Sequence, residues 1–367
     1  MKITLVISSL TELPGGGAER VISNMANFWA DTEHKVTLIT FDNGNNPYYL
    51  LSENVNWVAL DFIGSSNNWF EGLINNIKRI FKLRNAIVKS APDSIISFLF
   101  ATNILVLMAT RFLTTNVIIS ERNSPTFYRA NRRIWYLLRR LIYPYADHLV
   151  VQTREIGLFF TNYNKSVKAI PNSVIVLPEK MKQEPGFSLP PGKRIVAMGG
   201  LIYQKGFDLL LNIVSRLFEK FTDWNLIIMG KGTLDEELKN QAKRLGIESK
   251  VFFPGRVMNP FSILSRCDVF VLSSRYEGFP NALLEAMACG LPVVSFDCPT
   301  GPNQIIQHGI NGLLVPAEDK DRLKEALHSL MVEKEMRERM GEKASYVSKQ
   351  YAPDKIMALW EKLAFRG

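Results

Sequence analysis

Residues 268–304, with the sequence DVFVLSSRYEGFPNALLEAMACGLPVVSFDCPTGPNQ, decide the fold. Residues 268–272 form a short apolar run with the length and β-branched content of a buried parallel strand. After a loop, Pro280 stands where the first residue of a helix is expected, and Gly290 ends that helix just after Cys289. The stretch therefore predicts a strand, a loop and a helix that is buried, because its residues are apolar on almost every side.

The exception on this helix is Glu285, and a second carboxylate, Glu277, stands in the loop eight positions earlier. An unpaired carboxylate in apolar surroundings costs on the order of several kcal/mol, so Glu285 needs a partner. The N-terminus of a helix favours a diphosphate, and carboxylates accept hydrogen bonds from sugar hydroxyls. The arrangement therefore predicts a nucleotide-sugar pocket. The alternative is that Glu277 is a solvated acid of the loop and Glu285 an ion-paired structural acid.

Length and composition indicate a globular protein of two domains. The chain has 367 residues, of which 47% are hydrophobic and 22% charged. It has no apolar run of about 18 residues, so no transmembrane helix is expected, and the first ten residues resemble a strand and not a signal peptide. Three cysteines without a CxxC pair predict reduced thiols of a cytosolic protein, and four scattered histidines predict no metal site.

Strands and helices alternate along the chain, which predicts parallel sheets with helices on both faces in an α/β fold. Strands are expected at residues 3–8, 36–40, 94–98, 117–120, 148–152 and 167–170, and the alternation restarts at 194–199. Helices are expected from about residue 18 and at 72–89, 129–142, 319–333 and 352–365. Asp319 and Asp321 form a D-x-D pair, which helix capping explains better than metal binding.

A glycine-rich turn at residues 15–20 separates the first expected strand from its helix. In a doubly wound sheet this turn is where phosphate or substrate approaches the backbone. Arg20 replaces the last glycine of the dinucleotide-binding fingerprint, so that fingerprint is weak. Asp42, at the end of the second strand, keeps an NAD-dependent oxidoreductase as an alternative, and a turn without any ligand is another.

The positive charge is concentrated in one segment. Residues 71–140 carry twelve Lys or Arg and three Asp or Glu, and this difference of nine equals the formal net charge of the whole chain. Two amphipathic helices are expected there, and one arc of the second carries Arg129, Arg132, Arg133, Arg139 and Arg140. The pattern favours an anionic membrane or acceptor. A solvated basic face is the alternative, and no nucleic-acid-binding motif is present.

The segment EGFPNALLEAMACGLPVV, residues 277–294, resembles the signature of the large retaining glycosyltransferase family often called family 4. Gly-Gly-Ala-Glu-Arg at 16–20 and Ile-Pro-Asn-Ser-Val at 170–174 are similar to two further segments of that family. The resemblance implies two facing Rossmann-like domains, the GT-B fold, with a C-terminal helix that packs back on the first. It implies an N-terminal acceptor domain at 1–170, a linker at 171–192, a nucleotide-sugar domain at 193–350 and the returning helix at 351–367.

The resemblance also implies the roles of individual residues. Glu277 faces the sugar and diphosphate, Glu285 holds the ribose, and Lys205 neutralises the diphosphate. The loop at 252–257 packs on the nucleobase. The resemblance assigns donor binding to Gly16, Gly17, Lys205, Arg256, Val257, Glu277, Gly278, Phe279, Pro280, Asn281, Ala282 and Glu285. Relatives carry arginine where Gly200 stands here, and a histidine near Glu121 where Arg122 is the expected substitute, so the expected catalytic residues are Lys205, Glu277 and Arg122.

The activity that this resemblance implies is a retaining transfer from UDP-HexNAc or a UDP-hexose, without metal or other cofactor. The segments at 95–103 and 118–125 resemble enzymes that extend lipid-linked glycans, including N-acetylgalactosaminyltransferases. They imply a polyprenyl-diphosphate-linked saccharide as acceptor, in the assembly of bacterial surface glycans such as O-antigen and lipopolysaccharide. The expected location is cytoplasmic, on the inner face of the plasma membrane. A nucleotide-sugar epimerase of the same two-domain plan is the alternative.

Overall fold

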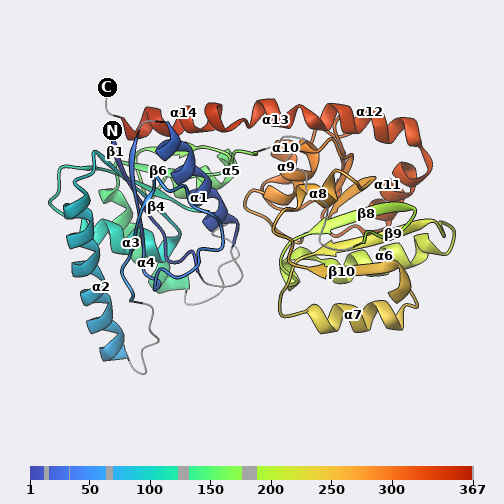
Figure 1. Ribbon diagram of the computed structural model, residues 1–367, viewed down its shortest axis with the longest axis horizontal. Helices are drawn as coiled ribbons and strands as arrows, with labels where there is room; N and C mark the ends of the chain where they lie inside the picture. Colours follow the sequence, from blue (N-terminus) through green and yellow to red (C-terminus); the bar gives the residue numbers. More distant parts are fainter. Residues whose placement is uncertain (12–15, 33, 63–68, 123–131, 176–187, 366–367) are drawn as a thin grey trace. The chain divides into compact units, whose positions relative to one another are not determined.

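The computed structural model describes residues 1–11, 16–32, 34–62, 69–122, 132–175 and 188–365, with backbone alone for 69–73 and 132–135 (Figure 1). Its contacts divide the chain into two compact units. The first unit comprises Met1–Asn172 with Pro353–Gly367, and the second comprises Ser173–Ala352. The chain therefore leaves the first unit after residue 172 and returns to it at residue 353.

The first unit is a doubly wound parallel sheet. Its described residues form seven strands in the order β3-β2-β1-β4-β5-β6-β7. The elements are β1 (Lys2–Val6), α1 (Gly17–Asp31), β2 (Lys35–Thr40), β3 (Asn56–Ala59), α2 (Trp69–Ser90), β4 (Ser94–Phe98), α3 (Phe100–Ala109), β5 (Asn116–Ser120), α4 (Arg132–Ile142), the 3₁₀ turn η2 (Tyr143–Tyr145), β6 (His148–Val151), α5 (Arg154–Phe160), β7 (Val167–Ala169) and α14 (Pro353–Ala364).

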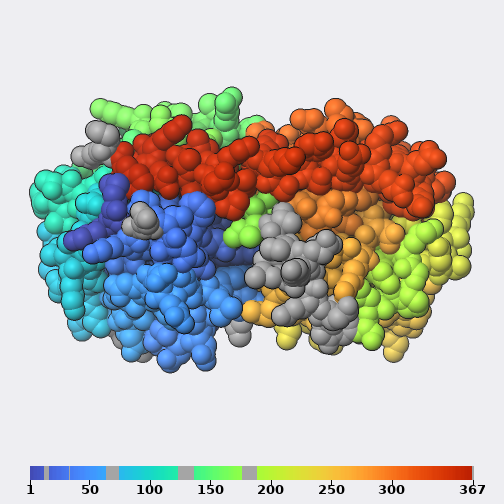
Figure 2. All heavy atoms as spheres, turned by 45° about the horizontal axis from the view of Figure 1, so that its top comes forward, coloured from blue at the N-terminus to red at the C-terminus, as the bar shows by residue number. Residues whose placement is uncertain are grey.

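Helices cover both faces of this sheet, which explains why β4 and β5 are buried along their whole length. On one face, Leu83 of α2 shares a core cluster with residues of α3, η2 and α5. On the other face, Trp360 of α14 stacks on Phe98 with ring centroids 6.0 Å apart. Trp29 of α1 donates a hydrogen bond to Glu361 at 2.9 Å. The predicted return of the C-terminal helix to the first domain is confirmed, and Figure 2 shows α14 in red against the first unit.

The second unit repeats the architecture with six strands among its described residues, in the order β10-β9-β8-β11-β12-β13. Its elements are β8 (Lys193–Met198), the 3₁₀ turn η4 (Tyr203–Lys205), α6 (Phe207–Phe218), β9 (Trp224–Met229), α7 (Asp235–Arg244), the 3₁₀ turn η5 (Glu248–Lys250), β10 (Val251–Gly255), α8 (Phe261–Leu264), β11 (Val269–Leu272), α9 (Asn281–Ala288), β12 (Val293–Asp297), α10 (Pro302–Ile305), β13 (Leu313–Pro316), α11 (Lys320–Val332), α12 (Lys334–Ser345) and α13 (Val347–Gln350). Both sheets are parallel, so the predicted fold class is confirmed.

The predicted elements fall close to the observed ones, but several observed elements, such as the helices α3 and α5, were not predicted. The edge strand β3 was not predicted, and its four residues are exposed or half-buried. The helix expected from residue 129 begins at Arg132 in the described residues. The capping role predicted for Asp319 is confirmed, because its side chain accepts a hydrogen bond from the Arg322 amide at 3.0 Å.

Candidate active site

The topological switch point of the second sheet brings two of the predicted site residues together. Strands β8 and β11 are neighbours, and the chain leaves their carboxyl ends in opposite directions along the sheet. Lys205 follows β8 and Glu277 follows β11. Doubly wound sheets bind ligands in the crevice at this point, so the fold positions Lys205 and Glu277 at a ligand-binding edge.

Lys205 and Glu277 form an ion pair at this edge. The Lys205 ammonium lies 2.6 Å from Glu277 Oε1, and 18% of the lysine side chain is exposed against 6% of the glutamate. The Ser274 hydroxyl donates to the same carboxylate oxygen at 2.6 Å. Gly199 has no side chain to collide with the methylene stem of Lys205. The pair therefore consists of a half-buried ammonium group held by a buried carboxylate.

The turn that carries Lys205 is fastened to the end of β11. Gly206 adopts a left-handed conformation with φ of 62°, and a side chain there would collide with the Ser273 carbonyl oxygen. The Ser273 hydroxyl donates a hydrogen bond to the Lys205 carbonyl at 2.9 Å. These contacts fix the backbone of Lys205 relative to the loop that leads to Glu277.

Arg275 clamps the same two loops from the side. Its guanidinium donates to both carboxylate oxygens of Asp208, at 2.8 and 2.7 Å, and to the Tyr203 carbonyl at 2.7 Å. The guanidinium also lies 3.9 Å from the centre of the Tyr203 ring. Burial raises the pKa of Asp208, but the hydrogen bond and charge of Arg275 outweigh it, and the net pKa is lowered. No sequence pattern indicates this clamp, since Arg275 and Asp208 are 67 residues apart.

Helix α9 begins beside Glu277. Asn281 and Ala282 at its N-terminus are half-buried, whereas the side of the helix that carries Glu285 is buried, with 5% of that residue exposed. Phe279 is buried and packs against Tyr351 with ring centroids 5.9 Å apart. The predicted donor residues of segment 277–285 therefore surround a helix start, where the positive end of the helix dipole favours an anion.

A cysteine near this pair is not available as a nucleophile. Cys298 is buried, and its burial, with a smaller contribution from the Glu277 charge, raises the pKa of its thiol. A thiol of raised pKa holds little of the reactive thiolate. Arg256 and Val257 follow β10 at the same carboxyl edge and are half-buried. Gly200 follows β8, and a Cβ atom there would make ordinary van der Waals contacts with Ile202 and the Lys231 carbonyl.

The remaining predicted site residues belong to the first unit. Gly16 precedes α1 and Gly17 is its first residue, while Gly15 lies outside the described residues. Arg122 follows β5 and is buried, with 6% exposed.

The oxidoreductase alternative loses its supporting residue. Asp42 is buried and accepts hydrogen bonds from the Ser9 hydroxyl at 2.8 Å, the Leu10 amide at 2.6 Å and the Thr40 hydroxyl at 2.6 Å. Burial opposes ionisation of Asp42, but these hydrogen bonds more than offset it and lower its pKa. The carboxylate is occupied in fastening the loop after β1, and is not presented to a ribose.

The predicted basic arc on the second amphipathic helix is wrong at Arg139. This residue is buried, and its Nε and Nη2 donate to Glu121 Oε1 at 3.1 and 2.9 Å. The Tyr143 hydroxyl donates to the same oxygen at 2.5 Å. Arg140 is exposed. Arg129 lies outside the described residues, as do the side chains of Arg132 and Arg133.

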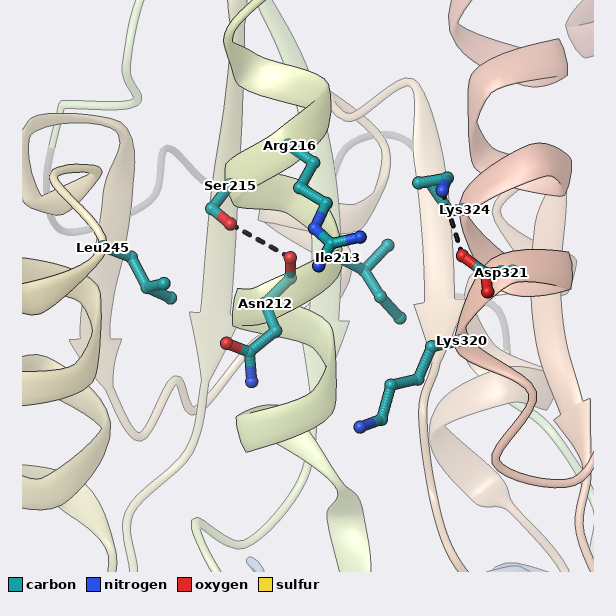
Figure 3. Close-up of a pocket in the computed structure, with 8 residues that line it drawn as sticks. All are labelled: Asn212, Ile213, Ser215, Arg216, Leu245, Lys320, Asp321 and Lys324. Carbon is teal, nitrogen blue, oxygen red and sulfur yellow. Dashed lines mark hydrogen bonds and ion pairs between the residues drawn. The ribbon is translucent and has the colours of Figure 1, made fainter.

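A separate cavity of about 470 Å³ lies in the second unit between α6 and α11 (Figure 3). Arg216 and Lys320 are turned toward this space, whereas Lys324 is paired with Asp321 at 3.0 Å. None of the residues that line it is a predicted site residue.

Two further features concern metals and membranes. No group of three or more His, Cys, Asp or Glu side chains in the described ranges is arranged to hold a metal ion. Within the same ranges, no helix combines the length and the apolar character needed to cross a bilayer.

Comparison with known proteins gives the family. Residues 15–176 match the profile described as Glycosyltransferase Family 4, and residues 180–346 match that of Glycosyl transferases group 1. An uncharacterized glycosyltransferase of Haemophilus influenzae is 30% identical over 352 residues, covering 94% of this chain and 95% of that protein. A second relative, from Campylobacter jejuni, is 30% identical over 366 residues, covering 99% of this chain and 98% of that protein. It is a GalNAc-α-(1→4)-GalNAc-α-(1→3)-diNAcBac-PP-undecaprenol α-1,4-N-acetyl-D-galactosaminyltransferase.

Solved structures share the fold at lower identity. Sucrose-phosphate synthase of Thermosynechococcus elongatus has a TM-score of 0.83 at 17% identity, covering 98% of this chain and 97% of that one. The Anabaena protein HepE, solved with UDP and glucose, has a TM-score of 0.77 at 18% identity, covering 100% of both chains. The two sequence relatives described above are glycosyltransferases, and the epimerase alternative has no support among them. This chain belongs to glycosyltransferase family 4, and it is a glycosyltransferase.

Proposed function

We propose that this glycosyltransferase moves an N-acetylhexosamine or hexose from a UDP-sugar to a polyprenyl-diphosphate-linked saccharide, with retention of anomeric configuration. The observation that carries the proposal is the Lys205–Glu277 pair at the switch point, beside the N-terminus of α9. An ammonium group and helix amides suit a diphosphate, while buried carboxylates accept hydrogen bonds from the hydroxyls of the sugar and the ribose. The named activity of the Campylobacter jejuni relative supports the lipid-linked acceptor and the assembly of bacterial surface glycans.

In this proposal the protein acts by positioning and by stabilising charge. Lys205 and the first amides of α9 stabilise the diphosphate as its bond to the sugar breaks. The departing phosphate oxygen takes the proton of the acceptor hydroxyl. The acceptor oxygen then bonds to the anomeric carbon on the face of the sugar that the diphosphate leaves. One well-placed donor of this kind contributes about 3–4 kcal/mol to transition-state stabilisation. Metal ions and other cofactors have no part in this scheme.

The test is transfer from a set of UDP-sugars to a short-chain polyprenyl-diphosphate saccharide, followed by mass spectrometry and by NMR of the anomeric proton. We expect one UDP-sugar to give a product that is longer by one sugar, with the anomeric configuration of the donor. Lys205→Ala should lower kcat by about 10²-fold. A protein that isomerises the donor without acceptor, or a Lys205→Ala variant as active as the parent, contradicts the proposal.

We propose further that the first unit docks on the anionic inner face of the plasma membrane, through α2. Ile74, Ile77 and Phe81 are 52%, 45% and 63% exposed and recur at helical spacing. The exposed Lys78 and Lys82 stand next to them in the sequence. An exposed apolar stripe flanked by cations binds anionic bilayers through both insertion and charge, each cation contributing about 1 kcal/mol.

Liposome sedimentation tests this docking, with phosphatidylglycerol-containing vesicles and neutral vesicles compared across a salt series. We expect binding only to the anionic vesicles, weakening with salt, and lost when Ile77 and Phe81 become Ser and Lys78 and Lys82 become Glu. The matched control is Lys239→Glu on α7. Arg139 is left unchanged, because its substitution would break a buried ion pair. Equal sedimentation of the quadruple variant and its parent refutes the membrane proposal.

A further inference from the structure

Three buried polar side chains at the carboxyl ends of the neighbouring strands β5 and β6 have atoms without a hydrogen-bond partner among the described residues. They are the hydroxyl of Ser120, the Nε and Nη1 atoms of Arg122, and the side-chain oxygen of Gln152. Ser120 at the end of β5 pairs with Val150 of β6. Arg122 and Gln152 each follow two residues later in their chains, just past the ends of these two adjacent strands. The Arg122 guanidinium lies over the ring of Phe98, which pairs with Ser120, so Arg122 and Ser120 share a face of the sheet. Buried polar atoms are normally bonded, so three neighbouring exceptions require an explanation.

The buried atoms that are energetically most costly are those of the Arg122 guanidinium, because it has no acidic partner among the described residues. Its Nη2 donates to the Asn172 side-chain oxygen at 2.8 Å, and its centre lies 4.2 Å from that of the Phe98 ring. The adjacent Glu121 is directed to Arg139 and Tyr143. Desolvation by burial lowers the pKa of Arg122 to about 9. A buried cation that lacks a counter-charge is strongly unfavourable.

The chemistry of the three groups indicates which ligand could form hydrogen bonds with them. A guanidinium donates to anionic oxygens, above all those of phosphate and carboxylate. The Ser120 hydroxyl can also donate to such an oxygen, while the Gln152 oxygen can accept from a sugar hydroxyl. The carboxyl edge of a doubly wound sheet is where this fold receives ligands. A phosphate group attached to a sugar matches all three.

We propose that Ser120, Arg122 and Gln152 form a subsite for a phosphate group of one of the substrates, with Arg122 as its counter-charge. The proposal rests on the glycosyl transfer proposed above, and deepens it by assigning a phosphate contact to the first unit. The phosphate could belong to the lipid-linked acceptor or to the donor. Arg122 is then a substrate-binding residue that contacts phosphate, in place of the catalytic role expected from the sequence.

Binding measurements test the subsite without depending on turnover. Inorganic pyrophosphate is titrated calorimetrically into the protein saturated with UDP, and UDP is titrated separately. If the phosphate is the acceptor's, Arg122→Gln should weaken pyrophosphate binding at least tenfold and leave UDP binding unchanged. If it is the donor's, Arg122→Gln should weaken UDP binding by a similar factor. Either result supports the subsite, and unchanged binding of both ligands overturns it.

Two further variants separate binding from stability. Gln152→Glu supplies a carboxylate as a counter-charge for Arg122, so this variant should have a higher melting temperature. The same carboxylate should weaken phosphate binding, because it repels the anion. This variant can be measured even if Arg122→Gln fails to fold. A purely structural Arg122 predicts the gain in stability with phosphate binding unchanged, which overturns the proposal. Arg111→Gln is the matched control, since Arg111 also stacks on an aromatic ring, that of Tyr145 at 3.7 Å, but is exposed. Absence of transfer, with Arg122-dependent pyrophosphate binding retained, contradicts the proposed function and leaves the subsite standing.

Discussion

Replacing Arg275 by alanine should loosen the turn that carries Lys205 while leaving both members of the Lys205–Glu277 pair in the chain. Arg275 holds Asp208 by two hydrogen bonds of 2.8 and 2.7 Å, and only 8% of the arginine side chain is exposed. The variant removes the clamp between the loop after β8 and the loop after β11. We expect lower turnover because the ammonium of Lys205 is then less well positioned.

The size of the effect follows from the exposure of the two side chains. A hydrogen bond to a charged group contributes about 1.5–3 kcal/mol when its partner is removed. The Asp208 side chain is 36% exposed, so solvent screens part of this energy. We therefore expect a coupling energy between Arg275 and Asp208 of about 1–2 kcal/mol. If the poorer positioning of Lys205 raises the activation free energy by about 1.4 kcal/mol, kcat falls tenfold.

A double-mutant cycle measures both quantities. Arg275→Ala, Asp208→Asn and the double variant are unfolded in urea, and kcat and the donor dissociation constant are measured for each. We expect the donor constant to change less than kcat, and Arg275→Lys to restore only part of the loss, since lysine lacks the planar fork. Lys239→Ala, which removes an exposed ion pair, is the control. A coupling energy near zero together with kcat within twofold of the parent refutes the clamp.

Three other outcomes are expected. Glu285→Ala should raise the donor dissociation constant with the melting temperature little changed, and equal donor binding in the variant and the parent contradicts the pocket. Glu121→Leu should cost about 3–5 kcal/mol in urea unfolding because it strands the buried charge of Arg139, and Glu121→Leu with Arg139→Leu should recover most of it. The pKa of Asp42 is lower in the folded chain than its usual value of 3.8, so its stabilisation is present above that pH and is lost as the pH falls below it. Asp42→Asn should then be less stable at neutral pH but lose less stability in acid, and identical acid profiles contradict this.

The sequence predicted those parts of the fold that depend on local patterns. The strand, loop and helix around Glu277 were predicted almost to the residue, because an apolar run, a proline and a glycine mark their limits. The cap at Asp319 was predicted for the same reason. The edge strand β3 was missed, since its residues are exposed or half-buried and carry no alternating pattern.

The site was predictable only where it depends on one segment. Glu277 and Glu285 lie within nine residues, and the resemblance to the family added Lys205. The clamp between Arg275 and Asp208 has no sequence pattern, because the fold alone brings the two residues together. The helical wheel of α4 grouped Arg139 with the exposed Arg140, since angular position on a helix does not reveal which side faces the core.

The return of α14 to the first unit has a consequence for the order in which the protein can be completed during synthesis. The second unit is a continuous segment, and all its strands have been made before Pro353 is added. The first unit, although it is translated earlier, lacks its cover over Phe98 and Trp29 until α14 emerges. The half of the protein that starts first therefore finishes last. A ribosome that stalls within the second unit would leave an apolar face of the first unit open to chaperones and proteases.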